Sequence, residues 1–191
     1  MARSGVPNRC KAMMIGMVAG VFATAARRAY ERSLAPRLFP EGQPPAFMGS
    51  TADDPVERLA LVAPQYRPDE TTYNTLARVV HSRLAGREAE SEETRELLKT
   101  LGDYGAGMLV GAAYGYTRTT TRSRDAAGAF FMGIRLWLAE IFAAPLLGLR
   151  AGPTRYSIDQ HARLLSTIWA FTFVMTTLTR VVYKILSPRH W

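Results

Sequence analysis

The chain lacks most of the sequence features that carry chemistry. Its 191 residues include a single cysteine, Cys10, which excludes an intramolecular disulfide and any metal site built from several cysteines. It has no Walker loop, dinucleotide-binding glycine fingerprint, nucleophile elbow or zinc motif. Its three histidines, His81, His161 and His190, are scattered, and we expect them at interfaces rather than as haem or metal ligands. We therefore predict a protein that is not an enzyme and that holds no cofactor or metal.

Acidic residues are scarce outside one central segment. Residues 27–100 carry 11 basic and 12 acidic residues, whereas the rest of the chain carries 13 basic and only 4 acidic ones. The net charge of +8 therefore belongs to the segments beside the apolar stretches. Nucleic-acid-binding proteins gather basic residues on one face with aromatic residues between them, whereas membrane proteins carry them at the ends of spans. The pattern predicts a lipid bilayer and other membrane proteins as partners, and no nucleic acid.

Long leucine-rich runs are missing as well, and the mean hydropathy of −0.06 is low for a polytopic membrane protein. Four stretches are nevertheless mostly apolar and are flanked by Lys or Arg. We predict an all-α fold, a polytopic membrane protein with about four transmembrane helices in one integral membrane domain, residues 1–191. The expected helices cover about 10–30, 91–118, 125–149 and 157–186, with a connector at 31–90. A soluble basic helical bundle is the alternative that the low hydropathy leaves open.

The first apolar stretch has two readings. Basic residues precede fifteen uncharged residues, Ala12 to Ala26, and Arg27 follows them, which is the order found in a cleavable signal peptide. Glycine interrupts this stretch, however, and we favour a retained membrane helix. Fifteen residues reach only about 22 Å of a core that is about 30 Å thick, so Lys11 and Arg27 are expected to snorkel.

Glycine is spaced regularly by four in two of the expected helices. In water each interior glycine would cost about 1 kcal/mol relative to alanine. In a membrane, small residues four apart let two backbones approach closely. The pattern predicts that the first and second helices pack together, and a further glycine extends the small-residue spacing to the third. The residues are Gly16, Gly20 and Thr24 in the first helix, Gly107, Gly111 and Gly115 in the second, and Gly133 in the third.

The connector is rich in proline, with seven of the eleven prolines between Pro36 and Pro68. Most of it is therefore expected to be extended chain and turns. A capping box from Asp54 to Glu57 predicts one short helix. An amphipathic helix is expected to begin near Asp69, because apolar residues then recur at helical spacing on one face: Tyr73, Leu76, Ala77, Val80 and Leu84. Packing on the protein's own bundle is the favoured role of that face, and docking on the membrane surface is the alternative.

Three charged residues are candidates for a polar site within the membrane: Glu140, Arg135 and Asp103. A charge inside a span costs about 3 kcal/mol, so each requires a reason. Glu140 has two readings, a carboxylate that titrates protons or binds a partner, and a carboxylate hydrogen-bonded inside the bundle. The expected partners in the second reading are Arg135, Tyr114, Thr172 and Thr176. Pro145 is expected to kink or end the third helix one turn later.

The last helix is expected to begin at a second capping box, Ser157 to Gln160. Its aromatic residues, with those of the third helix, form faces that could bind a lipid or a pigment. With four spans, both termini and the loop at 118–124 would lie on the same side of the membrane. The basic residues there favour cytoplasmic termini.

The features occur in an order that resembles a known family. A glycine-rich helix is followed by a proline-rich connector, the run Tyr104 to Gly115, the run Gly133-Ile-Arg-Leu-Trp137-Leu-Ala-Glu140, Pro145 and Gly148, and a helix opened by His161. This order resembles the YagU-like group of bacterial inner-membrane proteins. Such proteins tend to carry a histidine ahead of the glycine ridge, where this chain has Asp103. The resemblance implies a multi-pass protein of the bacterial inner membrane and implies no reaction.

Two functions fit these features. The first is a non-catalytic integral membrane protein that serves as an accessory or structural subunit of a larger membrane complex, for which an energy-converting complex is a candidate host. The alternative is a small proton-coupled transporter or channel-like oligomer that uses an intramembrane carboxylate, with Glu140 as the leading candidate.

Overall fold

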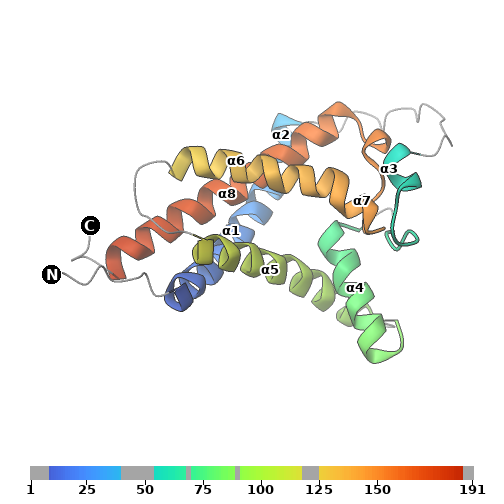
Figure 1. Ribbon diagram of the computed structural model, residues 1–191, viewed down its shortest axis with the longest axis horizontal. Helices are drawn as coiled ribbons and strands as arrows, with labels where there is room; N and C mark the ends of the chain where they lie inside the picture. Colours follow the sequence, from blue (N-terminus) through green and yellow to red (C-terminus); the bar gives the residue numbers. More distant parts are fainter. Residues whose placement is uncertain (1–8, 40–53, 68–69, 89–90, 118–124, 187–191) are drawn as a thin grey trace.

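The computed structural model describes residues 9–39, 54–67, 70–88, 91–117 and 125–186, and this part of the chain is all-α. The long helices lie within a few residues of the expected ranges, and short helices occupy the connector and the turn before the last helix (Figure 1). The elements are α1 (Arg9–Ser33), α2 (Ala35–Leu38), α3 (Pro55–Arg58), α4 (Thr72–Ala85), α5 (Glu92–Thr117), α6 (Asp125–Leu138), the π-helix η1 (Ala139–Ala143), α7 (Ala144–Leu146), the 3₁₀ turn η2 (Pro153–Arg155) and α8 (Ile158–Leu186).

Among the described residues, three helical segments are long and apolar enough to cross a membrane, which indicates a multi-pass membrane protein. They are Arg9–Ser33, Ala126–Leu146 and Ile158–Ile185. Helix α5, the expected second span, is not among them, because glycines, tyrosines and Asp103 lower its hydropathy. A fourth crossing by α5 therefore stays a prediction.

The helices pack side by side in the order α5, α1, α8, α6. Figure 1 shows α5 lying against α1, and α6 crossing α8. The core lies between the two inner helices, where Ala19 and Ala23 of α1 meet Phe171 and Met175 of α8. Half-buried side chains of the outer helices pack against this core: Val110 and Tyr114 from α5, and Met132 and Leu136 from α6.

The two glycine ridges meet in the contact between α1 and α5. A Cβ atom placed on Gly16 would lie 2.0 Å from the carbonyl oxygen of Gly111, and one on Gly20 would lie 2.1 Å from that of Gly107. Real Cβ atoms do not approach backbone so closely, so the helices can come together only with glycine at these positions. The contacts pair Gly16 with Gly111, Gly20 with Gly107, Thr24 with Gly107, and Ala12 with Gly115.

Gly133 has the same role between α6 and α8. A Cβ there would lie 2.2 Å from Cδ1 of Trp169, so the missing side chain leaves room for the indole ring. That ring also stacks on Phe130, with centroids 5.0 Å apart, and its Nε1 donates to the Phe130 carbonyl at 3.2 Å. At this position the aromatic groups of the third and fourth expected helices pack on each other.

The third expected helix is not continuous from 125 to 149, since it widens into the π-helix η1 and ends at Leu146. Pro145 explains the change, because it has no N–H to donate and its ring would clash with the preceding turn of a regular helix. The wider turn accommodates it, and the amide of Ala144 donates to the carbonyl of Ala139. Gly148, with φ of 67°, then reverses the chain.

The connector folds back on the turn before α8. Asp54 caps α3 as expected, accepting from the amide of Val56 at 2.7 Å, and it also accepts from the amide of Thr154 at 2.9 Å. Glu57, the other end of the expected capping box, accepts instead from the amide of Gly152 at 2.7 Å and from Arg155 at 2.9 Å. The two acids therefore fasten the connector to the turn between α7 and α8.

The amphipathic helix α4 begins at Thr72, a few residues later than expected. Its Tyr73 and Ala77 pack against α5, where a Cβ on Gly102 would lie 2.7 Å from the Tyr73 carbonyl oxygen. Other members of the expected apolar face, among them Val80 and Leu84, are exposed. Only part of that face is used for packing on the bundle, and docking of the remainder on a membrane surface stays open.

Candidate functional site

Charged side chains gather where the apolar parts of the helices end. On α1, Arg27 and Arg28 follow the uncharged run, and on α5, Asp103 precedes the glycine ridge. Because these helices are antiparallel, the three residues meet at one end of the bundle. Glu140 on η1 reaches the same level, since it contacts α4, which packs on α5. The charges thus form a polar layer at one end of the bundle.

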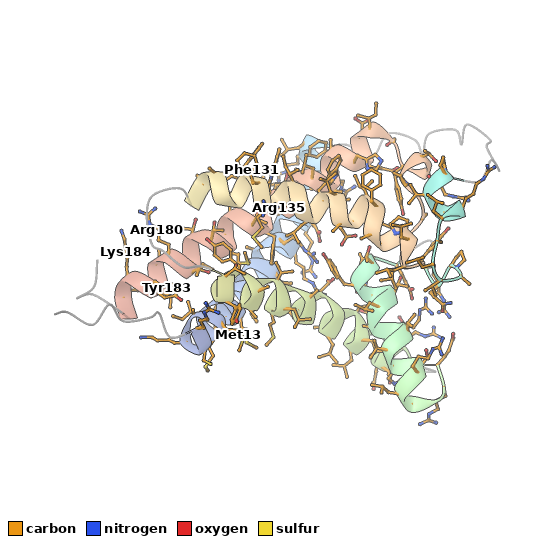
Figure 2. All side chains as sticks on the ribbon, in the orientation of Figure 1. Met13, Phe131, Arg135, Arg180, Tyr183 and Lys184 are labelled. Carbon is orange, nitrogen blue, oxygen red and sulfur yellow. The ribbon has the colours of Figure 1, made fainter. Side chains whose placement is uncertain are left out.

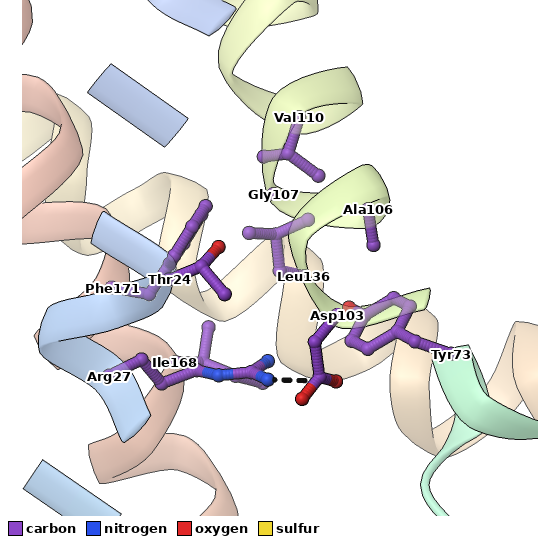
Figure 3. A pocket seen from close by; sticks show the side chains of 10 residues that line it. All are labelled: Thr24, Arg27, Tyr73, Asp103, Ala106, Gly107, Val110, Leu136, Ile168 and Phe171. Carbon is purple, nitrogen blue, oxygen red and sulfur yellow. Dashed lines mark ion pairs between the residues drawn. The ribbon is translucent and has the colours of Figure 1, made fainter. Parts of the chain in front are cut away.

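Asp103 is almost fully buried and is held by two arginines. Arg28 donates to its Oδ2 from Nε at 3.0 Å and from Nη2 at 2.8 Å. Nη2 of Arg27 lies 3.2 Å from Oδ1, as the dashed line in Figure 3 marks. The guanidinium of Arg28 also lies over the ring of Tyr104, 5.1 Å from its centroid. These pairs compensate the cost of burying the carboxylate and connect α1 to α5 beyond the glycine ridge.

Glu140 is equally buried, with 7% of its surface exposed. The Thr72 hydroxyl donates to its Oε2 at 2.5 Å, and Nη1 of Arg150 lies 3.4 Å from the same atom. Burial and the neighbouring Glu140 carboxylate raise the pKa of Tyr73, which lies beside Thr72 on α4. Glu140 thus joins the π-helical turn to α4.

These partners differ from all four that the sequence led us to expect. Arg135 is exposed on α6, and Tyr114 packs against the core from α5. The hydroxyls of Thr172 and Thr176 donate to carbonyl groups one turn earlier in their own helix, at 3.2 and 3.1 Å. The expectation failed because the observed partners come from the connector and from beyond the proline, where helical spacing gives no guide.

A cavity of about 310 Å³ opens beside Glu140, between α1, α4, η1 and α8. Its polar lining includes Arg27, Glu31, Thr72, Tyr73, Glu140 and Arg150. A cavity of this size is within the range of small-ligand sites, about 300–1,000 Å³. A narrow cleft of about 20 Å³ adjoins it and runs between α5 and α6 (Figure 3).

The charges around the cavity balance. Three carboxylates line it, those of Glu31, Glu70 and Glu140, and two guanidinium groups, those of Arg27 and Arg150. Glu70 has its own partner outside the lining, because Nε of Arg78 donates to it at 2.8 Å. Burial alone would raise the pKa of Glu70, but the hydrogen bond and charge of Arg78 outweigh burial and lower it. The cavity is therefore polar and close to neutral.

Arg135 is not brought together with Glu140 or Asp103. It lies on the outward face of α6, where Phe131 and Leu138 are also exposed, as is Phe142 on the adjoining η1. Figure 2 labels Phe131 and Arg135 one helical turn apart. Within the part of the chain that the structure describes, no hydrogen bond or ion pair engages the guanidinium of Arg135. An arginine near the middle of a candidate span therefore faces outward with no partner in the described part of the chain.

Neither of the two described histidines, His81 and His161, lines the cavity. His161, near the start of α8, has its Nε2 3.0 Å from the Pro153 carbonyl oxygen, and its ring meets the rings of Trp137 and Tyr156 edge-on. His81 is half-buried on α4, and His190 lies outside the described residues. Among the residues that the structure describes, no three metal-ligating side chains come together.

Sequence reasoning missed Thr72, Tyr73 and Arg150 as members of the site. Arg150 could have been noticed, because it is the first charge after Glu140 and follows the break at Pro145. Thr72 and Tyr73 have no such signal, since they come from a helix whose docking was not predicted in detail.

No protein-family model matches the chain, and no curated protein or solved structure was found to be similar to it.

Proposed function

We propose that the chain is a non-catalytic integral membrane protein, an accessory or structural subunit that packs against a larger membrane complex. The outward face of α6 is the contact surface in this proposal. Arg135 is the observation that carries it, because a charged side chain that faces lipid near the middle of a span costs about 3 kcal/mol. A partner helix that presents a carboxylate to Arg135 and apolar side chains to Phe131 and Phe142 would remove that cost.

The use of glycine supports the same surface. The ridges on α1 and α5 are occupied by each other, so they are not available to bind a second protein. The buried acids Asp103 and Glu140 have arginines beside them, which favours a structural role for the polar layer over a catalytic one. An energy-converting complex stays our candidate host.

The test is site-specific photocrosslinking in native membranes. A photoreactive amino acid at Phe142 should capture a specific protein, whereas one at Val18, exposed on α1, should capture mainly lipid. Arg135→Gln should weaken co-purification of that protein at least about tenfold, because the partner's charge is then left unpaired. The matched control Arg83→Gln, on the exposed surface of α4, should leave it unchanged. A chain that runs as a lone monomer in mild detergent and captures no protein would overturn the proposal.

A proton-coupled transporter or channel-like oligomer is the second candidate, because Glu140 lies on a π-helical turn beside the cavity. In this case Glu140→Gln should abolish a proton flux in liposomes while the protein stays folded. A flux that is unchanged in the variant, or that is absent from the unmodified protein, removes this candidate.

The remaining features of the proposal concern location. We place the protein in the bacterial inner membrane with both termini cytoplasmic, from the distribution of basic residues and from the resemblance to the YagU-like group. That resemblance stays a prediction. A bound lipid or pigment on the aromatic faces of α6 and α8 also stays a prediction.

A further inference from the structure

We propose that the 310 Å³ cavity binds the headgroup of a zwitterionic phospholipid with a primary ammonium group, a phosphatidylethanolamine. One acyl chain would lie along the cleft between α5 and α6. The inference depends on the membrane location and is independent of the proposed partner of α6.

The cavity offers guanidinium groups for a phosphate. Arg150 makes only one long contact with Glu140, at 3.4 Å, and its guanidinium is positioned over the ring of Tyr156, 4.5 Å from the centroid. Arg27 also lines the cavity, where its guanidinium lies between Glu31, 3.6 Å from Nε, and Asp103, 3.2 Å from Nη2. Arg150 therefore keeps donors for an anion, and Arg27 adds a second positive charge to the lining; guanidinium groups match phosphate geometry well.

The same cavity offers acceptors for an ammonium group. The carboxylates of Glu140 and Glu31 line it, and the Glu31 side chain is 39% exposed, so it is accessible from the cavity. Because the lining is close to neutral, a ligand with one positive and one negative group leaves no charge unpaired. An anionic headgroup would have no ammonium group to donate hydrogen bonds to the carboxylates of Glu140 and Glu31. A trimethylammonium group would have no N–H to donate to them.

The position of the cavity identifies a lipid as the source of this headgroup. It lies where the charged layer meets the apolar parts of α1 and α8, and Leu164 and Ile168 belong to its lining. The adjoining cleft shares Arg27, Tyr73 and Ile168 with it and continues to apolar side chains farther from the polar end. Those side chains are Val110 of α5, Leu136 of α6 and Phe171 of α8. The cleft is too narrow to enclose an acyl chain, but it gives one an apolar surface that leads away from the headgroup.

Native mass spectrometry of the full chain in mild detergent tests the proposal. The protein is equilibrated with equal amounts of dioleoyl phosphatidylethanolamine, phosphatidylglycerol and phosphatidylcholine. We expect one molecule of phosphatidylethanolamine to be retained, with at least about tenfold preference over each competitor, since each mismatched headgroup loses charge-assisted hydrogen bonds. Arg150→Gln should reduce this retention by about the same factor, and the control Arg83→Gln should not.

Comparison of lipids on the unmodified protein keeps the test decisive if Arg150→Gln fails to fold. Equal retention of the three lipids would show a non-selective lipid shell and overturn the proposal. Glycerophosphoethanolamine has the same headgroup and no acyl chains. If it displaced the bound lipid at the same concentration as a short-chain phosphatidylethanolamine does, the proposal would also be overturned. That result would assign the cavity to a soluble zwitterion instead.

Discussion

Single glycine residues set the distance between α1 and α5. At Gly111 even one methyl group would lie 2.1 Å from the Gly16 carbonyl oxygen, a backbone atom that can move only if the whole helix moves. At Gly105, on the same helix, no atom other than the neighbouring backbone of α5 itself lies within 4 Å of the corresponding position. Gly105 and Gly111 therefore have the same unfavourable helix propensity relative to alanine, but only Gly111 is in close contact with another helix.

This difference gives the first prediction. Gly111→Ala should destabilise the folded protein by about 1–3 kcal/mol, the usual range for overpacking, or by more if the helices separate. Gly105→Ala should stabilise it by up to about 1 kcal/mol, because alanine is the better helix former. Thermal unfolding of both variants in the same detergent measures the two effects. Equal shifts in the unfolding temperature would show that the α1–α5 contact is not formed as described.

The docking of the connector depends on two ionised acids. Asp54 is 1% exposed, and burial alone would raise its pKa above its ordinary value of 3.8. Hydrogen bonds from the side chain and backbone of Thr154, and from the amide of Val56, outweigh burial and lower the pKa. The pKa of Glu70, just before α4, is likewise lowered from its ordinary value of 4.5. Both groups therefore favour the folded state in their charged forms.

The sign of these shifts gives the second prediction. Because the folded state lowers the pKa values of Asp54 and Glu70, their contribution to docking is complete at a pH above their ordinary pKa values of 3.8 and 4.5. It is lost as the pH falls through their lower pKa values in the folded state. Spin labels at Leu61→Cys and Ile158→Cys, in a Cys10→Ser background, should give one narrow distance distribution at pH 7 and at pH 5. The distribution should broaden below about pH 3.8.

Asp54→Asn is the control for this element. It cannot become charged, so its distance distribution should be broader already at pH 7 and should change less on acidification. A distribution that stays narrow at pH 3 in the unmodified connector would show that other contacts hold it in place.

Elements with a local signal could be predicted from the sequence. The caps at Asp54 and Ser157 lie where the capping boxes placed them, and the amide of Gln160 donates to the Ser157 hydroxyl at 3.2 Å. The spacing of glycines likewise indicated the contact between α1 and α5. Glu140 could be recognised as a candidate, but its partners could not, because Thr72 is 68 residues away and belongs to another helix. The π-helical turn also has no periodic signature, since it arises from how one proline is accommodated.

At the scale of the whole molecule, the order α5, α1, α8, α6 separates the chain into two ends. One end carries the polar layer with Asp103 and Glu140. The other end carries Cys10 at the start of α1 and, on the last turns of α8, Arg180 and Lys184 (Figure 2). Between them, each long helix is mostly uncharged. This separation agrees with a bilayer that lies between two polar ends.

The number of membrane crossings determines on which side of the membrane the end of α1 and the start of α8 lie. The end of α1 and the start of α8 lie at the same end of the bundle, because α2, directly after α1, contacts α8 (Figure 1). If α5 crosses the membrane beside α1, the chain crosses four times, and Ser33 and Ile158 face the same side. If α5 does not cross, three crossings would place Ser33 and Ile158 on opposite sides.

Cysteine accessibility distinguishes these arrangements and is the third prediction. Single cysteines at Ser33 or Ile158, both exposed, in a Cys10→Ser background should react with a membrane-impermeant maleimide from one side of the membrane. Native Cys10, also exposed, should react only from the other side. With cytoplasmic termini, Cys10 is protected in intact spheroplasts and the two introduced cysteines are labelled. Labelling of Ser33→Cys and Ile158→Cys from opposite sides would show that α5 does not cross the membrane. It would also contradict the packing of α1 and α8, which places Ser33 and Ile158 at the same end of the bundle.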